Sequence, residues 1–295
     1  MFFDRTVSAV SMSCYLCGSE RHSLRPGTVR DNPAIQVLEC EDCGLVYLSS
    51  QSHIADGHYE NSGMHSGKDL SIGTWLEESR IDDERRYEFL KKRMTERSLL
   101  DFGCGNGGFL NLAKESASVS VGIELEKALQ PSFKSRGLTV YPNLDVAKEQ
   151  AQQWDLITAF HVVEHLFDPL AILQQLSTML SEKGEIIIEV PSSDDALLTL
   201  YENEAFQNFT YWSQHLFLFN ANTMQRLIAK AGLKLNWIEH VQRYSLANHL
   251  YWLAKGKPGG HEKWVSLNDD ELNAQYERQL ASIGRTDTII ASISI

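Results

Sequence analysis

A glycine-rich stretch at residues 99–109 constrains the fold more than any other feature of this chain. It reads LLDFGCGNGGF, in which the two leucines are typical of a buried strand and the glycines of a tight turn that opens a helix. Glycines in such a turn let the backbone approach a ligand that a side chain would block. Gly103, Gly105 and Gly108 also fit G-x-G-x-x-G, the pattern of dinucleotide-binding loops.

Two acidic residues indicate which ligand this turn favours. Asp101 is the last charged residue before the turn, and its carboxylate would repel a pyrophosphate but attract an ammonium or sulfonium group. Glu124 ends the next predicted strand, 21 positions after Gly103, the spacing at which an acid accepts hydrogen bonds from ribose hydroxyls. A nucleoside with a cationic amino-acid part is therefore favoured, and an NAD-dependent oxidoreductase is the disfavoured alternative.

At these residues the chain resembles the class I S-adenosylmethionine-dependent methyltransferases. Their D-x-G-x-G-x-G loop corresponds to residues 101–107, and residues 154–165 are similar to the fourth strand and following loop of the ubiquinone-biosynthesis-like branch. The resemblance covers about residues 99–232. It implies S-adenosylmethionine as cofactor, held by Arg86, Asp101, Gly103, Cys104, Gly105, Asn106, Gly107, Glu124, Leu125, Asn143, Leu144, Phe160 and His161.

The alternation of strand and helix patterns predicts an α/β fold with a doubly wound, Rossmann-like sheet. Seven strands are expected. The first ends at residues 99–100, and the other six cover residues 119–124, 138–141, 154–160, 185–190, 233–241 and 286–293. Helices are expected at 82–94, from 168 to about 183, and at 223–231. The resemblance implies that the last strand is inserted antiparallel.

Four of the five cysteines form two C-x2-C pairs that are typical of a zinc ribbon. Cys14 and Cys17 are separated by 22 residues from Cys40 and Cys43. Four thiolates leave no open coordination position, so the zinc is expected to be structural; the alternative is free thiols in a reducing compartment. Cys104 is interpreted as a small buried residue of the glycine turn.

The predicted organisation is a zinc ribbon at 1–50, a connector or lid at 51–80, and a methyltransferase domain at 81–295 with an insertion at about 244–284. Methyltransferases that act on sugars, including deoxysugar C-methyltransferases, often carry such a four-cysteine segment, so the resemblance favours a sugar acceptor. A zinc ribbon that recognises RNA is the alternative, because residues 21–30 are mildly basic.

The run from His161 to His165 also fits H-x-x-E-H, a metalloprotease pattern. We disfavour that interpretation, because the run directly follows a predicted strand and Asp168-Pro169 interrupts it before a long helix can form. Under the resemblance, His161 lies beside the methionine part of the cofactor. Glu164 and His165 either face the substrate or merely hydrogen-bond to each other or to the backbone.

An aromatic segment at 201–219 supplies the candidate general base. Tyr211 and Trp212 are expected to contact the substrate, and His215 is expected to accept its proton, with its pKa lowered toward neutrality by the aromatic surroundings; His165 is the alternative base. Sugar C-methyltransferases carry a Y-x-E-H run here, of which only the histidine is present. O-methylation is therefore favoured over C-methylation.

Cations in the predicted insertion suggest an anionic acceptor. Arg243, Lys255 and Lys257 precede a glycine-rich turn, which favours contact with a phosphate, as in a nucleotide-linked sugar. The expected substrate contacts here are Arg243, Tyr244, Asn248, His249 and Lys257. Alternatively, the cations neutralise nearby acids such as Glu262, Asp269 and Asp270 on a solvated connector.

The net charge of −12 disfavours nucleic-acid and anionic-membrane partners. No apolar run long enough to span a membrane and no leader pattern is found, so a cytoplasmic location is expected. The predicted function is methyl transfer from S-adenosylmethionine to a hydroxyl of a small acceptor, a sugar or nucleotide-linked sugar. An RNA-directed methyltransferase, an RNA-binding protein and a sugar C-methyltransferase are the alternatives, and the oligomeric state is left open.

Overall fold

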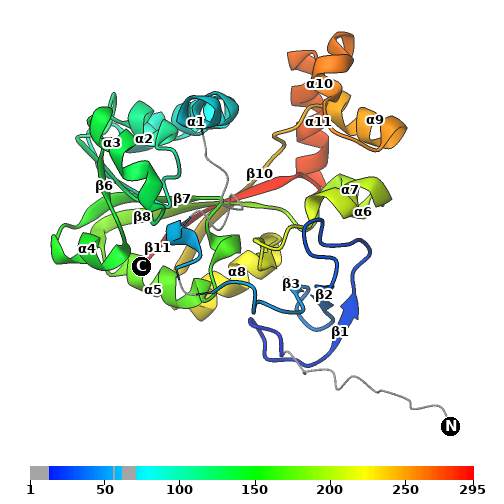
Figure 1. The fold of residues 1–295 in the computed structure, drawn as a ribbon, viewed down its shortest axis with the longest axis horizontal. Helices are drawn as coiled ribbons and strands as arrows, with labels where there is room; N and C mark the ends of the chain where they lie inside the picture. Colours follow the sequence, from blue (N-terminus) through cyan, green and yellow to red (C-terminus); the bar gives the residue numbers. More distant parts are fainter. Residues whose placement is uncertain (1–12, 56, 62–70) are drawn as a thin grey trace.

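A seven-stranded sheet forms the centre of the molecule. The computed structural model describes residues 13–55, 57–61 and 71–295 (Figure 1). The strand order is β10-β11-β8-β7-β4-β5-β6. The strands are β4 (Ser98–Phe102), β5 (Val119–Ile123), β6 (Thr139–Tyr141), β7 (Trp154–Phe160), β8 (Leu180–Pro191), β10 (Lys234–Val241) and β11 (Thr288–Ser294). The predicted α/β fold is confirmed.

Strand directions follow the expected doubly wound pattern. β4 pairs in parallel with β5 on one side and with β7 on the other. β5 in turn pairs in parallel with β6, and β7 pairs in parallel with β8. Only the last strand of this sheet, β11, is antiparallel, and it is antiparallel to both of its neighbours, β8 and β10. The carboxyl ends of β4, β5 and β7 therefore meet at one edge, where open α/β sheets bind ligands.

Helices cover both faces of this sheet (Figure 1). One face carries α1 (Ile72–Met94), α2 (Gly108–Ala113) and α3 (Gln130–Ser135), and the other carries α4 (Leu144–Glu149), α5 (Pro169–Ser177) and α8 (Ala221–Lys230). Successive strand residues pack against opposite helix layers. Leu99 lies in a hydrophobic cluster with residues of α1, whereas Leu100 lies in a hydrophobic cluster with residues of α5 and α8. Burial on both faces explains why the central strands are almost continuously apolar.

Two predicted helix boundaries were wrong. Helix α1 begins ten residues before Asp82, at Ile72, where the Ser71 side chain accepts a hydrogen bond from the Thr74 amide and caps the helix. Residues 72–80 are thus helical and not part of a connector. Helix α5 ends at Ser177, and Leu180 already belongs to β8, where it pairs with Trp154. In the remainder of the predicted connector, residues 56 and 62–70 lie outside the described residues.

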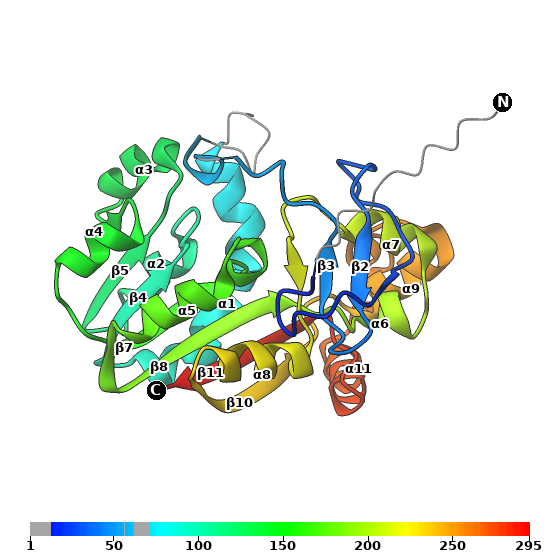
Figure 2. The ribbon, with the colours of Figure 1, turned by 90° about the horizontal axis from the view of Figure 1, so that it is seen from below.

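The amino-terminal segment forms a second, smaller sheet. β1 (His22–Leu24), β2 (Val37–Cys40) and β3 (Val46–Leu48) pair antiparallel, and β3 also pairs with β9 (Phe217–Leu218) from the large domain. Figure 2 shows β2 and β3 at the end of the large sheet. Docking is reinforced by Thr28, which donates to Asn208, and by Asp31, which accepts from Ser213.

The four cysteines of the C-x2-C pairs converge in this segment. The Sγ atoms of Cys14 and Cys43 are 3.5 Å apart, as are those of Cys17 and Cys40. All four sulfurs lie within 4.8 Å of one another. Tetrahedral zinc with bonds of about 2.3 Å spaces its sulfurs by about 3.8 Å, so the cluster fits a structural zinc ion.

The segment before β11 forms a helical layer beyond the sheet edge (Figure 1). It contains α9 (Leu246–Lys255), α10 (Gly260–Lys263), a 3-10 turn at Val265–Leu267, and α11 (Asp270–Ser282). It lies near α6 (Ala196–Thr199) and α7 (Glu204–Thr210). In the described parts of the chain, no helix has the length and apolar character needed to cross a bilayer.

We predict about one zinc ion per chain, and its loss from Cys17→Ser, because three thiolates bind zinc less tightly than four. Since β3 pairs with β9, losing the ion should expose both the amino-terminal segment and residues near 217 to proteolysis. Elemental analysis and limited proteolysis measure the two effects. Cys104→Ala is the matched control and should keep its zinc, since Cys104 lies outside the cluster. Purified wild-type protein without metal, prepared without chelator, would contradict the prediction.

Candidate functional site

A cavity of about 380 Å³ opens at the carboxyl ends of β4, β5 and β7. We call it the turn cavity, because the glycine turn forms one wall and α1 another. Ten of the predicted cofactor residues line it: Arg86, Asp101, Gly103, Cys104, Gly105, Asn106, Glu124, Leu125, Phe160 and His161. The other three do not line it. Gly107 is the N-cap of α2, and Asn143 and Leu144 start α4, where Asn143 accepts a hydrogen bond from the Val146 amide.

The turn is packed so tightly that Gly103 and Gly108 have no room for a side chain. Gly103 has a φ of +71°, and a Cβ there would lie 2.5 Å from Cγ2 of Val162. A Cβ at Gly108 would collide with the carboxylate of Asp83 on α1. The glycines therefore hold the turn between α1 and the loop after β7. Cys104 is buried here, as predicted, and burial raises its pKa.

Carboxyl groups dominate the polar wall of the turn cavity. Burial raises the pKa of Asp101 to about 7, and it also raises the pKa values of Asp83 and Glu124. Asp101 accepts a 2.7 Å hydrogen bond from Thr158, and Glu124 accepts bonds from the amides of Gly105 and Glu126. Closely spaced buried carboxylates are costly unless a cation enters, so the cavity suits a positively charged ligand.

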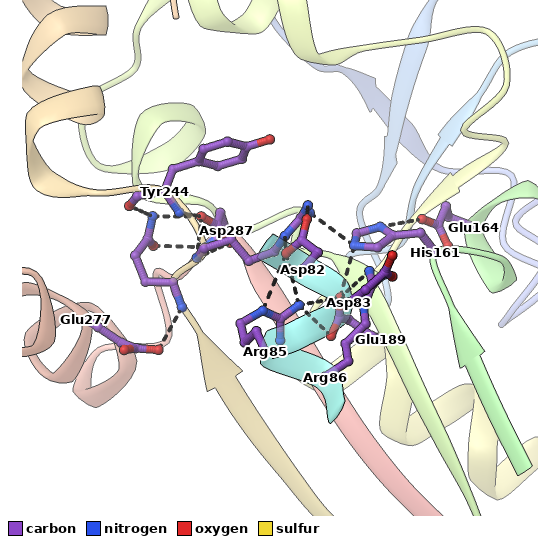
Figure 3. Close-up of polar contacts among 12 residues, drawn as sticks. Asp82, Asp83, Arg85, Arg86, His161, Glu164, Glu189, Tyr244, Glu277 and Asp287 are labelled. Atoms are coloured by element: carbon purple, nitrogen blue, oxygen red, sulfur yellow. Dashed lines mark hydrogen bonds and ion pairs between the residues drawn. The ribbon is translucent and has the colours of Figure 1, made fainter. Parts of the chain in front are cut away.

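A buried glutamate holds two of the residues that line this cavity, Arg86 and His161 (Figure 3). Glu189 of β8 is fully buried and accepts hydrogen bonds from Arg85 at 2.8 Å and from Arg86 at 2.7 Å. His161 Nε2 lies 3.3 Å from the same carboxylate. Burial alone would raise the pKa of Glu189, but Arg86 and His161 bring it well below its usual value. The guanidinium of Arg86, held in this way, stacks 4.8 Å from the ring centroid of Phe160.

Arg243, which was predicted to bind a phosphate, instead joins this network. Its guanidinium forms an ion pair with Asp82 of α1, and its Nη1 lies 3.1 Å from Nε2 of His161 (Figure 3). Burial opposes the charge of Asp82, yet Arg243 lowers its pKa to about 2. Asp82, and not one of the acids near residue 262, is thus the ion-pair partner of Arg243 among the described residues, and contact with a phosphate stays a prediction. Lys255 and Lys257 are exposed and line neither of the two cavities described here.

A second cavity, of about 240 Å³, adjoins the first and shares His161 and Arg243 with it. We call it the insertion cavity, since α9 lies in its wall together with α6, α7 and the amino-terminal segment. Its apolar side contains Phe206, Phe209 and Trp252. Its polar lining consists of Arg30, His161, Ser192, Asp195, Thr210, His215, Arg243, Tyr244, Asn248, His249, Asp287 and Thr288.

Of the seven predicted substrate residues, four line the insertion cavity, Arg243 among them, and three do not, Lys257 among them. Tyr244, Asn248 and His249 belong to its wall. Asn248 Oδ1 accepts hydrogen bonds from Gly259 and Gly260, so it also fixes the glycine turn. His249 contacts Tyr276 and Gln242, and burial lowers its pKa to about 4. Tyr211, by contrast, is buried in the core, and Trp212 stacks beside Arg30 without lining the cavity.

The two candidate bases lie on either side of the boundary between the cavities. His165 lines the turn cavity and His215 the insertion cavity, with ring centroids 4.9 Å apart. Burial lowers the pKa of His215 to about 3, far past neutrality, so its free imidazole is a weak base. The His161–His165 run is not a protease helix: residues Val163–His165 form a 3-10 turn, and Glu164 contacts His161 at 3.1 Å.

Sequence reasoning missed several wall residues. Asp82 and Asp83 were not proposed as site residues, because the start of α1 was placed ten residues too late, at Asp82 itself. Asp195 follows the carboxyl end of β8, a position that would have marked it as a candidate. Arg30 gives no such signal, because only the pairing of β3 with β9 brings its segment to the cavity.

We predict that Glu189→Ala destabilises the fold by about 3–5 kcal/mol, because it leaves two arginines without their buried counter-charge. Chemical denaturation measures this loss. The pKa of Glu189 is lower in the folded state, so its contribution is present above the unfolded-state pKa and disappears as the pH falls. Glu84→Ala, which breaks the exposed pair with Arg80, is the control and should cost less than about 1 kcal/mol. Equal losses in the two variants would contradict the prediction.

Comparison with known proteins places this geometry in a known context. A family model described as a methyltransferase domain matches residues 76–236, more than half of the chain. The chain is 27% identical over 173 residues to the ubiquinone biosynthesis O-methyltransferase of Acinetobacter baylyi, covering 54% of this chain and 71% of that protein. It is 29% identical over 118 residues to an uncharacterized protein of Methanocaldococcus jannaschii, covering 40% of this chain and 49% of that protein. The chain thus spans between about half and about seven tenths of the length of these relatives.

Among solved structures, a SAM-dependent methyltransferase from Archaeoglobus fulgidus is similar, with a TM-score of 0.51 and 19% identity. The match covers 75% of this chain and 99% of the other. At this level of identity the likeness concerns the fold, and it confirms the seven-stranded architecture.

Proposed function

Because the chain belongs to the methyltransferase domain family, we propose that it transfers a methyl group from S-adenosylmethionine to a hydroxyl of a sugar or nucleotide-linked sugar. The observation that carries the proposal is the pair of adjoining cavities with His161 and Arg243 at their shared boundary. Methyl transfer needs two binding sites that meet at the reacting atoms. The turn cavity is the donor site and the insertion cavity is the acceptor site.

The residues of the turn cavity fit the methyl donor. S-adenosylmethionine supplies an electrophilic methyl group on a positively charged sulfur and also carries an ammonium group. Asp101, with its raised pKa, lies where a cation would be stabilised, and Glu124 ends the strand that faces the ribose in this family. Phe160, fixed by Arg86, and Leu125 supply apolar surface in the same cavity.

The lining of the insertion cavity fits a polyhydroxylated acceptor. Burial raises the pKa of Asp195 to about 8, so this carboxyl group is protonated at neutral pH and able to donate a hydrogen bond. Asp195 Oδ2 and Asn248 Nδ2 make no hydrogen bond with described residues, which leaves both for a ligand. The aromatic side chains of the opposite wall provide a surface for a sugar ring and exclude water.

The chemistry required of the protein is alignment and activation of the hydroxyl. The transfer is an in-line displacement, so most of the rate acceleration comes from holding the two substrates in position. The hydroxyl must also lose a proton as it attacks. We place His215 beside this hydroxyl, because it lines the acceptor site and its ring nitrogens make no hydrogen bond with a described residue.

Arg30 favours an acceptor that carries a phosphate. It is exposed at the insertion cavity and stacks on Phe209 and Trp212, and it forms no ion pair within the described residues. Its guanidinium can therefore bind an anionic group, the role that the sequence had suggested for Arg243 and Lys257. A nucleotide-linked sugar would place its phosphates at Arg30 and its sugar inside the cavity.

We predict that donor affinity rises as the pH increases through about 7, because a cationic ligand favours the ionised form of Asp101. Below that pH, Asp101 must give up its proton before binding, which weakens the affinity up to about tenfold per pH unit. Calorimetry with S-adenosylmethionine between pH 6 and 8 measures the slope. Asp101→Asn should remove this part of the slope and weaken binding at pH 8 by about 10- to 100-fold.

The comparison between wild type and variant isolates Asp101, since the titration of the donor itself is common to both. Glu88→Gln, on the outer face of α1, is the charge-matched control and should keep the wild-type slope. Wild-type protein that binds NAD but neither S-adenosylmethionine nor its demethylated product would refute the proposed function.

We predict that Arg30→Ala raises the KM for a nucleotide-linked sugar about 10- to 100-fold, the scale of losing a hydrogen bond to a charged group. Donor affinity should not change. Initial rates with labelled methyl donor and a panel of nucleoside diphosphate sugars and free sugars measure the effect. Lys257→Ala, which removes an exposed cation outside the cavity, is the control. An equal KM in wild type and Arg30→Ala would argue for an acceptor without phosphate.

A further inference from the structure

Three potential metal ligands meet at the boundary between the two cavities. One donor atom each from Glu164, His165 and His215 lies within 4.8 Å of the other two. Glu164 is completely buried, and its Oε2 has no hydrogen-bond partner within the described residues. A buried carboxylate oxygen without a partner carries a desolvation cost that a bound cation would offset.

The hydrogen bonds of the cluster prepare the histidines for coordination. His165 Nδ1 lies 2.8 Å from the carbonyl oxygen of Gln214, so this nitrogen carries the proton and donates it. Nε2 is therefore left with its lone pair, and it lies 3.9 Å from Oε1 of Glu164. A backbone carbonyl that fixes the tautomer of a ligating histidine is a recurrent feature of metal sites. His215 makes no competing ring hydrogen bond with a described residue, so its ring nitrogens are available to an ion.

We propose that Glu164, His165 and His215 bind a divalent transition-metal ion that coordinates the acceptor hydroxyl. Two imidazoles and one carboxylate, with positions left open, suit Zn²⁺, Mn²⁺ or Fe²⁺ better than Mg²⁺, which prefers oxygen ligands. The inference rests on the proposed function, because the acceptor hydroxyl that would take the open coordination position comes from the adjoining cavity. His165 faces the donor site and His215 the acceptor site, so the ion would lie where the methyl group is transferred.

The ion would activate the acceptor hydroxyl. Coordination lowers the pKa of a bound hydroxyl, which then releases its proton to water. The alkoxide oxygen forms a bond to the methyl carbon of the donor while the carbon–sulfur bond breaks. The bonding electron pair stays on sulfur, giving the neutral thioether product, the methyl ether and one proton. The metal keeps its oxidation state throughout.

A binding experiment on the full chain separates this site from the cysteine cluster. Mn²⁺ is the probe, because it favours oxygen and nitrogen ligands over the four thiolates. Equilibrium dialysis of the zinc-loaded protein should give about one Mn²⁺ per chain. Glu164→Gln and His215→Ala should weaken Mn²⁺ binding at least tenfold. His240→Ala removes a half-buried histidine outside the cluster and should bind Mn²⁺ as wild type does.

A second readout tests the position of the ion. Mn²⁺ is paramagnetic, so it should broaden the methyl resonance of ¹³C-methyl-labelled S-adenosylmethionine bound to the wild type. The broadening should be lost in His215→Ala while donor affinity, measured by calorimetry, stays within about twofold of wild type. Retained donor binding also shows that the variant is folded.

The inference is overturned if the wild type takes up no Mn²⁺ at millimolar concentration, or if Glu164→Gln and His215→Ala bind it as tightly as wild type. Either result with intact donor binding leaves the proposed function standing. Absence of donor binding in the wild type would instead remove the proposed function itself.

Discussion

The site depends on one buried charge, the carboxylate of Glu189. It lies near the carboxyl end of β8 and gathers Arg85 and Arg86 from α1 and His161 from the loop after β7. Arg243 extends the set from the end of β10 and ties it back to α1 through Asp82. A buried ion pair of this kind contributes little net stability, because desolvation offsets the attraction. The network instead fixes positions: it holds α1, the two loops and the sheet in one arrangement. Arg86, His161 and Arg243, which belong to it, line the cavities.

The pattern of the core could be predicted from the sequence, and for clear physical reasons. The strands are apolar runs punctuated by glycine, asparagine and proline, so their number and order follow from local composition. The glycine turn is equally local, because Gly103 must adopt a backbone conformation that other residues disfavour. Ten residues of the wall of the turn cavity were predicted, from these local patterns and from the resemblance. Asp101, Glu124, Phe160 and His161 all stand at or just after the ends of strands.

What the sequence could not provide was the pairing of distant groups. Arg243 was read as an unpaired cation, because nothing near it in the chain reveals that Asp82, 161 residues away, lies opposite. Asp82 and Asp83 were placed at the start of a predicted helix, although they stand in the middle of α1 and line the cavity. In both cases a local rule of electrostatics was overridden by a contact within the site. His215 shows the same effect in its pKa, which depends on how completely the surrounding elements bury it.

The ribbon has a consequence for how the chain matures during synthesis. Its outer strands, β1 to β3, are complete once about 50 residues have emerged, but the partner of Val46 is Leu218. The small sheet therefore stays one strand short until the ribosome has added a further 170 residues or so, and contacts over such a separation form late. During that interval β3 presents an unpaired edge, which is a template for aggregation. Early capture of zinc by the two cysteine pairs would hold the nascent ribbon in shape until β9 arrives. The metal would then stabilise the amino-terminal segment during synthesis, before it becomes part of the finished structure.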